Sequence, residues 1–237
     1  MLLGANAPEM DLLRTRAARL GYRVVAAKTP DQAHALLRVG GTRIGAVIVP
    51  SDLPVLDLRT ALDALRRLVP AHELSWLAAG RDPGPAGRDH MREAGVHLAL
   101  FDPVDTHTLR FQLNRALAGR RLASGRRRTV RAPCDRPVLV RVAGRRKEGR
   151  LYSVSASGAF VAIDQPSLAR ASVTIEVALP NAGLLRLPAR VVMTNVPGNL
   201  ARTSLPWGMG VQFDDVDEGA SVALLVYAQE RFRSLAV

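Results

Sequence analysis

The stretch RRRTVRAPCDRPVLVRVAGRRKEGRLYSVSASG at residues 126–158 carries a short motif at each of its ends. It opens with an arginine cluster and closes with a serine- and glycine-rich segment where a strand would turn. Guanidinium groups on a short segment form paired hydrogen bonds with phosphate and stack on flat rings. The cluster therefore predicts a site for a small anionic ligand such as a nucleotide with two phosphates. Its arginines are Arg126, Arg127, Arg128 and Arg131.

The sequence after Pro133 alternates apolar residues with polar or small ones, a period of two that is typical of β-strands. Turn residues separate the six segments, so we expect a small six-stranded antiparallel barrel. Apolar residues at helical spacing in residues 219–235 predict a C-terminal helix that caps the barrel or pairs with a second chain. The strand segments are RPVLVRVAG, EGRLYSVS, SGAFVAID, SVTIEVAL, LLRLPARVVMTNV and WGMGVQFD.

The two motifs resemble those of the PilZ domain, a cytoplasmic receptor module for cyclic di-GMP. The family motifs are Arg-x-x-x-Arg, which is intact at residues 127–131, and Asp/Asn-x-Ser-x-x-Gly, which aligns with residues 153–158. The segment WGMGVQF at residues 207–213 is also similar to the last strand of the family. The resemblance runs along residues 127–237 and implies a PilZ β-barrel domain there.

The resemblance implies that the arginine motif grips phosphate and guanine while the second motif lies beneath the base. Ser153 departs from the family, because it replaces an acid or amide that accepts hydrogen bonds from guanine. A hydrogen bond to a charged group contributes about 1.5–3 kcal/mol, so we expect roughly ten- to a hundredfold weaker binding. The alternative is a PilZ-like protein-interaction module that has lost the nucleotide. The implied ligand-binding residues are Arg126, Arg127, Arg131, Ser153, Ser155 and Gly158.

Residues 1–118 alternate short apolar runs with amphipathic stretches, which predicts a parallel sheet covered by helices. Five such units indicate a flavodoxin-like (βα)5 domain, and their order resembles a response-regulator receiver. The expected strands are residues 1–5, 22–26, 44–49, 74–78 and 97–101. The expected helices are residues 9–20, 30–39, 55–68, 86–94 and 106–117.

Receiver chemistry needs a magnesium site built from carboxylates and a phosphate-accepting aspartate. Ala5 and Asn6 stand where the acidic pair belongs, and Pro50 stands at the acceptor position. Ala79 replaces the hydroxyl residue, while Asp102-Pro103 replaces a Lys-Pro pair. We therefore expect a pseudo-receiver without phosphorylation, even at the neighbouring Asp52. It either stabilises its neighbour or docks a protein partner or a second copy, and we favour docking.

The formal charge is +12, and its distribution is uneven. Residues 120–150 hold 12 basic side chains against Asp135 and Glu148, a net of +10. Such concentration favours one anionic ligand over a generally basic protein. A nucleic-acid binder is a weaker alternative, because Tyr152 and Phe160 are the nearest candidates for base stacking and no recognition helix stands out.

The remaining composition argues against several other classes. No apolar run approaches the roughly 18 residues of a membrane span, and the start does not resemble a signal peptide, so we expect a cytoplasmic protein. The single cysteine, Cys134, excludes an internal disulfide and is expected to be a buried apolar residue. The five histidines are scattered through the first half, and no P-loop is present, so we expect no enzyme, no metal and no cofactor.

Together these observations predict a bacterial signalling adaptor with a pseudo-receiver at residues 1–118, a basic linker at 119–126 and a PilZ barrel at 127–237. Cyclic di-GMP is the expected ligand, and its binding between the domains is expected to change their arrangement and regulate a protein partner. A homodimer is a further expectation.

Overall fold

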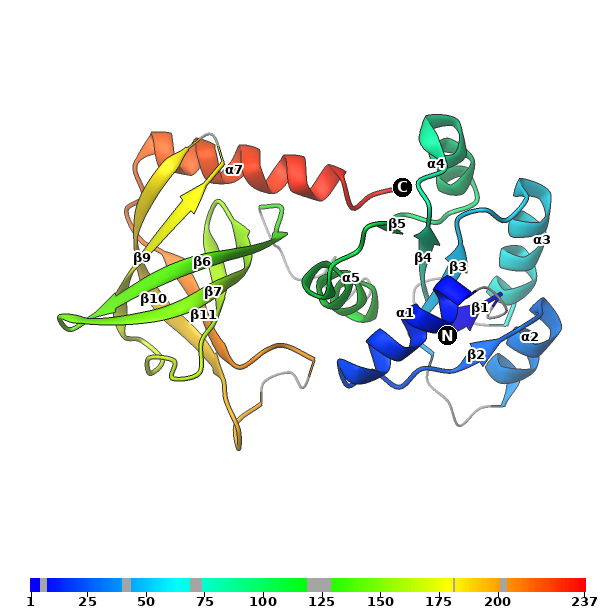
Figure 1. Ribbon diagram of the computed structural model, residues 1–237, viewed down its shortest axis with the longest axis horizontal. Helices are drawn as coiled ribbons and strands as arrows, with labels where there is room; N and C mark the ends of the chain where they lie inside the picture. The colour runs from blue at the N-terminus through cyan, green and yellow to red at the C-terminus, as the bar shows by residue number, and fades with distance from the viewer. Residues whose placement is uncertain (5–7, 40–43, 69–73, 119–128, 181, 201–203) are drawn as a thin grey trace. The chain divides into compact units, whose positions relative to one another are not determined.

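The structure is a computed structural model, and it divides into two compact units (Figure 1). The α/β unit comprises Met1–Arg126 together with Leu235–Val237, and the barrel unit comprises Arg127–Ser234. The predicted barrel domain ran to residue 237, whereas the last three residues make their contacts in the α/β unit. The structure describes all residues except 5–7, 40–43, 69–73, 119–128, 181 and 201–203.

The α/β unit is built on a five-stranded parallel sheet of order β2-β1-β3-β4-β5, which confirms the flavodoxin-like prediction. The strands are β1 (Leu2–Leu3), β2 (Ala26–Ala27), β3 (Ala46–Pro50), β4 (Ser75–Gly80) and β5 (Leu98–Phe101). The helices are α1 (Pro8–Arg19), α2 (Pro30–Arg38), α3 (Val55–Arg66), α4 (Gly84–Glu93) and α5 (Thr106–Ala118).

Helices cover both faces of this sheet, so its central strands are apolar on both sides (Figure 1). In β3, Val47 and Val49 share a core with residues of α2, α3 and α4. The alternate residues Ala46 and Ile48 share the opposite core with α1 and α5. This two-sided burial explains why β3 reads as a continuous apolar run.

The barrel unit is a closed antiparallel barrel of order β10-β11-β8-β7-β6-β9, in which β9 pairs with β10 to complete the ring. The predicted six-stranded barrel is thereby confirmed. The strands are β6 (Ala132–Val142), β7 (Arg145–Ser155), β8 (Gly158–Ala162), β9 (Ser172–Leu179), β10 (Gly183–Asn195) and β11 (Gly208–Phe213).

The interior of the barrel is filled by every second residue of its strands. In β9, Val173, Ile175 and Val177 are buried, while Thr174 and Glu176 between them face outward. The glycines of β11 let neighbouring backbone approach closely. A Cβ at Gly208 would lie 2.0 Å from the Val161 carbonyl oxygen, so no other residue fits there without a shift.

A long helix, α7 (Glu218–Arg233), follows the barrel and packs on β6 and β7. The Asp217 side chain caps it by accepting a hydrogen bond of 2.9 Å from the Ala220 amide. Ala220 and Leu224 lie in the barrel core, one helical turn apart, so the helix covers the barrel as expected. None of the helices in the described part of the chain is long and apolar enough to cross a membrane.

Candidate nucleotide-binding site

The two sequence motifs lie beside each other because β6 and β7 form an antiparallel pair. β6 begins directly after the arginine motif, and β7 ends inside the serine-glycine motif. The register places Ala132 opposite Val154 and Pro133 opposite Ser153. Residues more than twenty positions apart in the chain therefore meet at one end of the strand pair.

A side-chain contact joins the two motifs directly. Thr129, at the centre of the Arg-x-x-x-Arg motif, forms a hydrogen bond of 3.0 Å with Ser157 in the turn between β7 and β8, hydroxyl to hydroxyl. This contact holds the chain next to Arg131 against the turn. Arg131 precedes β6 and is half-buried. The predicted site residues Arg126 and Arg127, like Arg128, lie outside the described residues.

Ser155 and Gly158 shape the turn between β7 and β8. The Ser155 hydroxyl is buried and donates a hydrogen bond of 3.0 Å to the Gly158 carbonyl oxygen. A Cβ at Gly158 would lie 2.4 Å from the Val211 carbonyl oxygen on β11. Gly158 therefore allows β8 to approach β11 closely, and Ser155 stabilises the turn that precedes β8.

Ser153, the residue that departs from the family motif, lies within β7 and is only 3% exposed. A bulge between Leu151 and Ser153 interrupts the pairing of β7 with β8 next to it. The short hydroxyl therefore lies beneath the surface rather than on it. An acid or amide at this position would reach further than serine does.

An ion pair near the motifs was not anticipated from the sequence. Asp135 lies in a bulge of β6 with a positive φ of 45°, and its carboxylate accepts a hydrogen bond of 2.7 Å from Arg150 Nε. This hydrogen bond raises the pKa of Arg150. Asp135, one of the two acidic residues in the basic segment 120–150, is therefore paired with Arg150 on the neighbouring strand. No local pattern reveals the contact, because it depends on the register of β6 against β7.

The aromatic residues of the barrel do not form a stacking platform. Tyr152 and Phe160 are buried and contact each other edge to face, with ring centroids 5.8 Å apart. Trp207 is 53% exposed, but Gly158 pairs with Gln212 while Ala162 pairs with Gly208, so Trp207 lies at the far end of these strands. Tyr152 and Phe160, the predicted candidates for nucleic-acid stacking, are therefore buried rather than exposed to bases.

At the carboxyl edge of the α/β sheet, where a receiver would hold phosphate, hydrogen bonds join the ends of β3, β4 and β5. The Ser51 hydroxyl donates to the Arg81 carbonyl oxygen at 2.6 Å, and the Asp102 amide donates to the Gly80 carbonyl oxygen at 2.9 Å. Pro50 ends β3 at the predicted acceptor position, and Ala79 lies within β4. Among the described residues no cluster of three or more His, Cys, Asp or Glu could hold a metal ion. Ala5 and Asn6 lie outside them.

Comparison with known proteins assigns the barrel region. The PilZ domain family model matches residues 125–229. Solved structures similar to this chain include the inhibitor of motility MotI/DgrA of Bacillus subtilis, with 21% identity over 46% of this chain and 52% of that one, at a TM-score of 0.40. The PilZ domain of YcgR from Escherichia coli with c-di-GMP has 20% identity over 46% of this chain and 93% of that chain, at a TM-score of 0.34.

This chain matches only about half the length of the Bacillus subtilis protein. No curated protein matches its sequence. The family match covers the closed barrel, the adjoining motifs and most of the helix that follows. Residues 125–229 of this chain are therefore a PilZ domain.

Proposed function

We propose that this chain is a cyclic di-GMP-responsive adaptor that binds the dinucleotide through Arg127 and Arg131, with Arg126 as a helper. The hydrogen bond between Thr129 and Ser157 is the observation that supports this most directly. It anchors the middle of the arginine motif on the serine-glycine turn. Arginines that flank an anchored residue have less freedom to lose when they close on a ligand.

The local charge supports an anionic ligand with more than one phosphate. Residues 120–150 carry a net charge of +10, and Asp135 is already paired with Arg150. Arginine binds phosphate through two parallel hydrogen bonds and can also stack on a guanine ring. Cyclic di-GMP presents both groups within one compact molecule.

Binding is expected to act on the arrangement of the two units. The boundary between their contacts falls at Arg126 and Arg127, inside the arginine cluster. A ligand that binds this segment changes the connection between the units, which is a common way of switching a two-domain protein. A protein partner that binds the α/β unit would then respond to the changed arrangement of the two units.

A PilZ-like interaction module without nucleotide is the second candidate, and Ser153 favours it. Its hydroxyl is buried and replaces an acid or amide. A domain of this kind would act through proteins alone, with the arginines contacting an acidic surface.

Calorimetric titration of cyclic di-GMP into the full chain tests the proposal. Arg131→Ala and Arg127→Ala should each abolish measurable binding, since each removes a charged phosphate contact. Arg145→Ala is the matched control, because Arg145 is exposed at the other end of the same strand pair and its loss should leave the affinity unchanged. Ser153→Asp should tighten binding roughly ten- to a hundredfold by restoring a charged acceptor.

The outcomes separate the candidates. Binding that is lost in the arginine variants but not in Arg145→Ala supports the receptor. If only Ser153→Asn or Ser153→Asp binds, the natural chain is an interaction module. Weakening of equal size in all three arginine variants, with a steep salt dependence, would mean a general electrostatic contact and would overturn the proposed site.

A further inference from the structure

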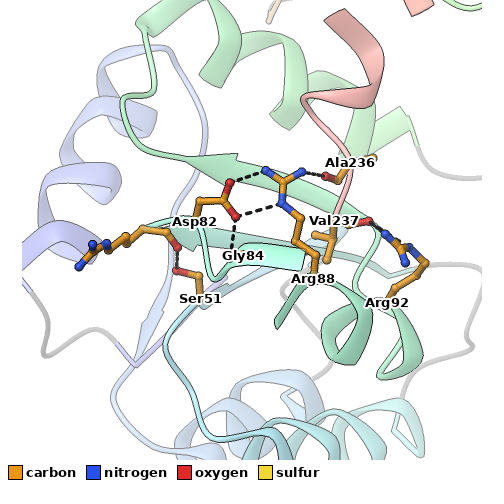
Figure 2. Close-up of polar contacts among 8 residues, drawn as sticks. Ser51, Asp82, Gly84, Arg88, Arg92, Ala236 and Val237 are labelled. Carbon is orange, nitrogen blue, oxygen red and sulfur yellow. Dashed lines mark hydrogen bonds and ion pairs between the residues drawn. The ribbon is translucent and has the colours of Figure 1, made fainter. Parts of the chain in front are cut away.

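The last three residues of the chain lie beside β5, and Figure 2 shows Ala236 and Val237 next to Arg88 and Arg92. β5 is an edge strand, so one side of its backbone has no partner within the sheet. Ala236 pairs antiparallel with Leu98, and the Ala99 amide donates a hydrogen bond of 3.1 Å to the Leu235 carbonyl oxygen. The segment therefore adds one isolated antiparallel bridge to the edge of the sheet.

Side-chain donors converge on this segment from α4 and α5, the helices before and after β5 in the chain. The buried Gln112 of α5 donates to the Leu235 oxygen at 2.7 Å and to the Ala99 oxygen at 2.8 Å, bridging segment and strand. Arg92 of α4 donates to the Val237 main-chain oxygen from Nη2 at 2.8 Å and from Nε at 3.1 Å. A fully buried amide is costly without a partner, so Gln112 depends on the segment being in place.

A third donor, Arg88 of α4, contacts Phe101 and Asp82 as well as the segment. Its guanidinium lies over the Phe101 ring, 4.9 Å from the centroid, and donates to the Asp82 carboxylate at 2.6 and 3.0 Å. The same group reaches the Ala236 oxygen at 3.4 Å (Figure 2). The hydrogen bond from Arg88 lowers the pKa of Asp82.

The apolar side chains of the segment are buried in the core of the α/β unit rather than exposed at its surface. Leu235 is 5% exposed and Val237 is 3% exposed, and Val237 shares a core with Met91, Val96 and Ala99. The intervening Ala236 is half-buried. An apolar-small-apolar pattern in extended form matches this edge, as in peptide recognition by strand addition.

We propose that β5, α4 and α5 form a docking site for an extended peptide, and that its occupant is the chain's own segment Leu235–Val237. Because the barrel unit ends at Ser234, docking attaches that unit to the α/β unit a second time. The first attachment is the basic segment before Arg127.

Hydrogen exchange on the full chain tests the docking site. The double variant Leu235→Asp, Val237→Asp places charges in apolar positions, so the Ala99 amide should exchange roughly tenfold faster or more. The control Val222→Asp makes the same kind of change at a side chain of α7 that is 53% exposed, and should leave Ala99 unaffected. In a Trp207→Phe background, the fluorescence of Trp76, in β4, reports whether the α/β unit stays folded.

Rescue in trans separates docking from general damage. A synthetic peptide with the sequence of residues 229–237, QERFRSLAV, should restore protection of Ala99 in the double variant and should not in Gln112→Leu combined with that variant. Unchanged exchange at Ala99 in the double variant would overturn the proposal. Protection in the natural chain that rises with protein concentration would also overturn it, since the segment of a second copy would then be the occupant.

Discussion

Single residues around the serine-glycine turn show that motif matching and ligand contact are separate matters. Ser155 and Gly158 match the PilZ motif, yet both also have structural roles at this turn. The Ser155 hydroxyl donates a hydrogen bond within the turn, and Gly158 leaves room for the backbone of β11. Thr129, at a variable position of the arginine motif, joins the two motifs through its hydroxyl. Loss of Ser155 or Gly158 would therefore change the barrel itself, and a binding defect in such variants would not identify a ligand contact.

Gly158→Ala is expected to destabilise the barrel by about 1–3 kcal/mol, because its Cβ would lie 2.4 Å from the Val211 carbonyl oxygen and must push backbone aside. Denaturant unfolding measured by Trp207 fluorescence in a Trp76→Phe background checks this. The control is Gly219→Ala on α7, where the nearest atom is the Asp217 carboxylate oxygen at 3.2 Å and alanine suits the helix. Equal stability of the two variants would contradict the close approach.

Cys134 is expected to react slowly with thiol reagents in the folded protein. It is buried at 8% exposure, and burial raises its pKa, so the reactive thiolate is scarcer at neutral pH than for a free cysteine. Labelling kinetics between pH 7 and 9, with and without denaturant, test this. The folded chain should remain much slower than the unfolded chain throughout, and fast labelling at pH 7 would contradict it.

Among the elements, α7 packs on the barrel, while the residues directly after it contact the α/β unit. Its buried residues Ala220, Leu224 and Ala228 recur every fourth position and face β6 and β7. The chain then leaves the helix and adds a strand segment to β5. The family model ends at residue 229, before this change of partner.

Leu224→Ala should cost the barrel about 2–5 kcal/mol, since the side chain is fully buried in the barrel core and its removal leaves a cavity. Val222→Ala on the exposed face of the same helix should change stability by about 0.5 kcal/mol or less. The Trp207 signal in the Trp76→Phe background measures both. Similar losses in the two variants would mean that α7 packs through a different face.

At the scale of the whole molecule, the positive charge is distributed unevenly between the two units. Residues 1–118 carry 15 basic and 12 acidic groups, a net of +3, so most of the excess of +12 lies beyond them. The α/β unit keeps the receiver-like sheet but has Pro50 and Ala79 at positions where phosphoryl chemistry needs oxygen donors.

Incubation with acetyl phosphate and magnesium should leave the chain unphosphorylated, because the acceptor position is a proline and the lysine position is Asp102. Intact mass measurement under native conditions checks this. Incorporation of phosphate that disappears in Asp52→Asn would contradict the pseudo-receiver assignment and would place the acceptor on the next loop.

Sequence periodicity was enough to predict both folds. Period-two alternation in segments such as SVTIEVAL specifies strands with one buried face, and six of them close a barrel. The paired apolar runs and amphipathic helices of the first half specify a two-sided parallel sheet in the same way. The predicted and observed edges differ most at β1 and β2, which span Leu2–Leu3 and Ala26–Ala27 where residues 1–5 and 22–26 are predicted.

The sequence by itself determined the units and the PilZ motifs, because these depend on local patterns that repeat within a segment. Only the tertiary structure decided which distant groups meet: Thr129 with Ser157, Asp135 with Arg150, and Leu235–Val237 with β5. It also decided that Ser153 is buried. Such contacts follow from strand register and from the path of the chain between the units, neither of which is visible in a local pattern. A segment of three residues is too short to show a hydrophobic period, so the sequence alone does not predict what it contacts.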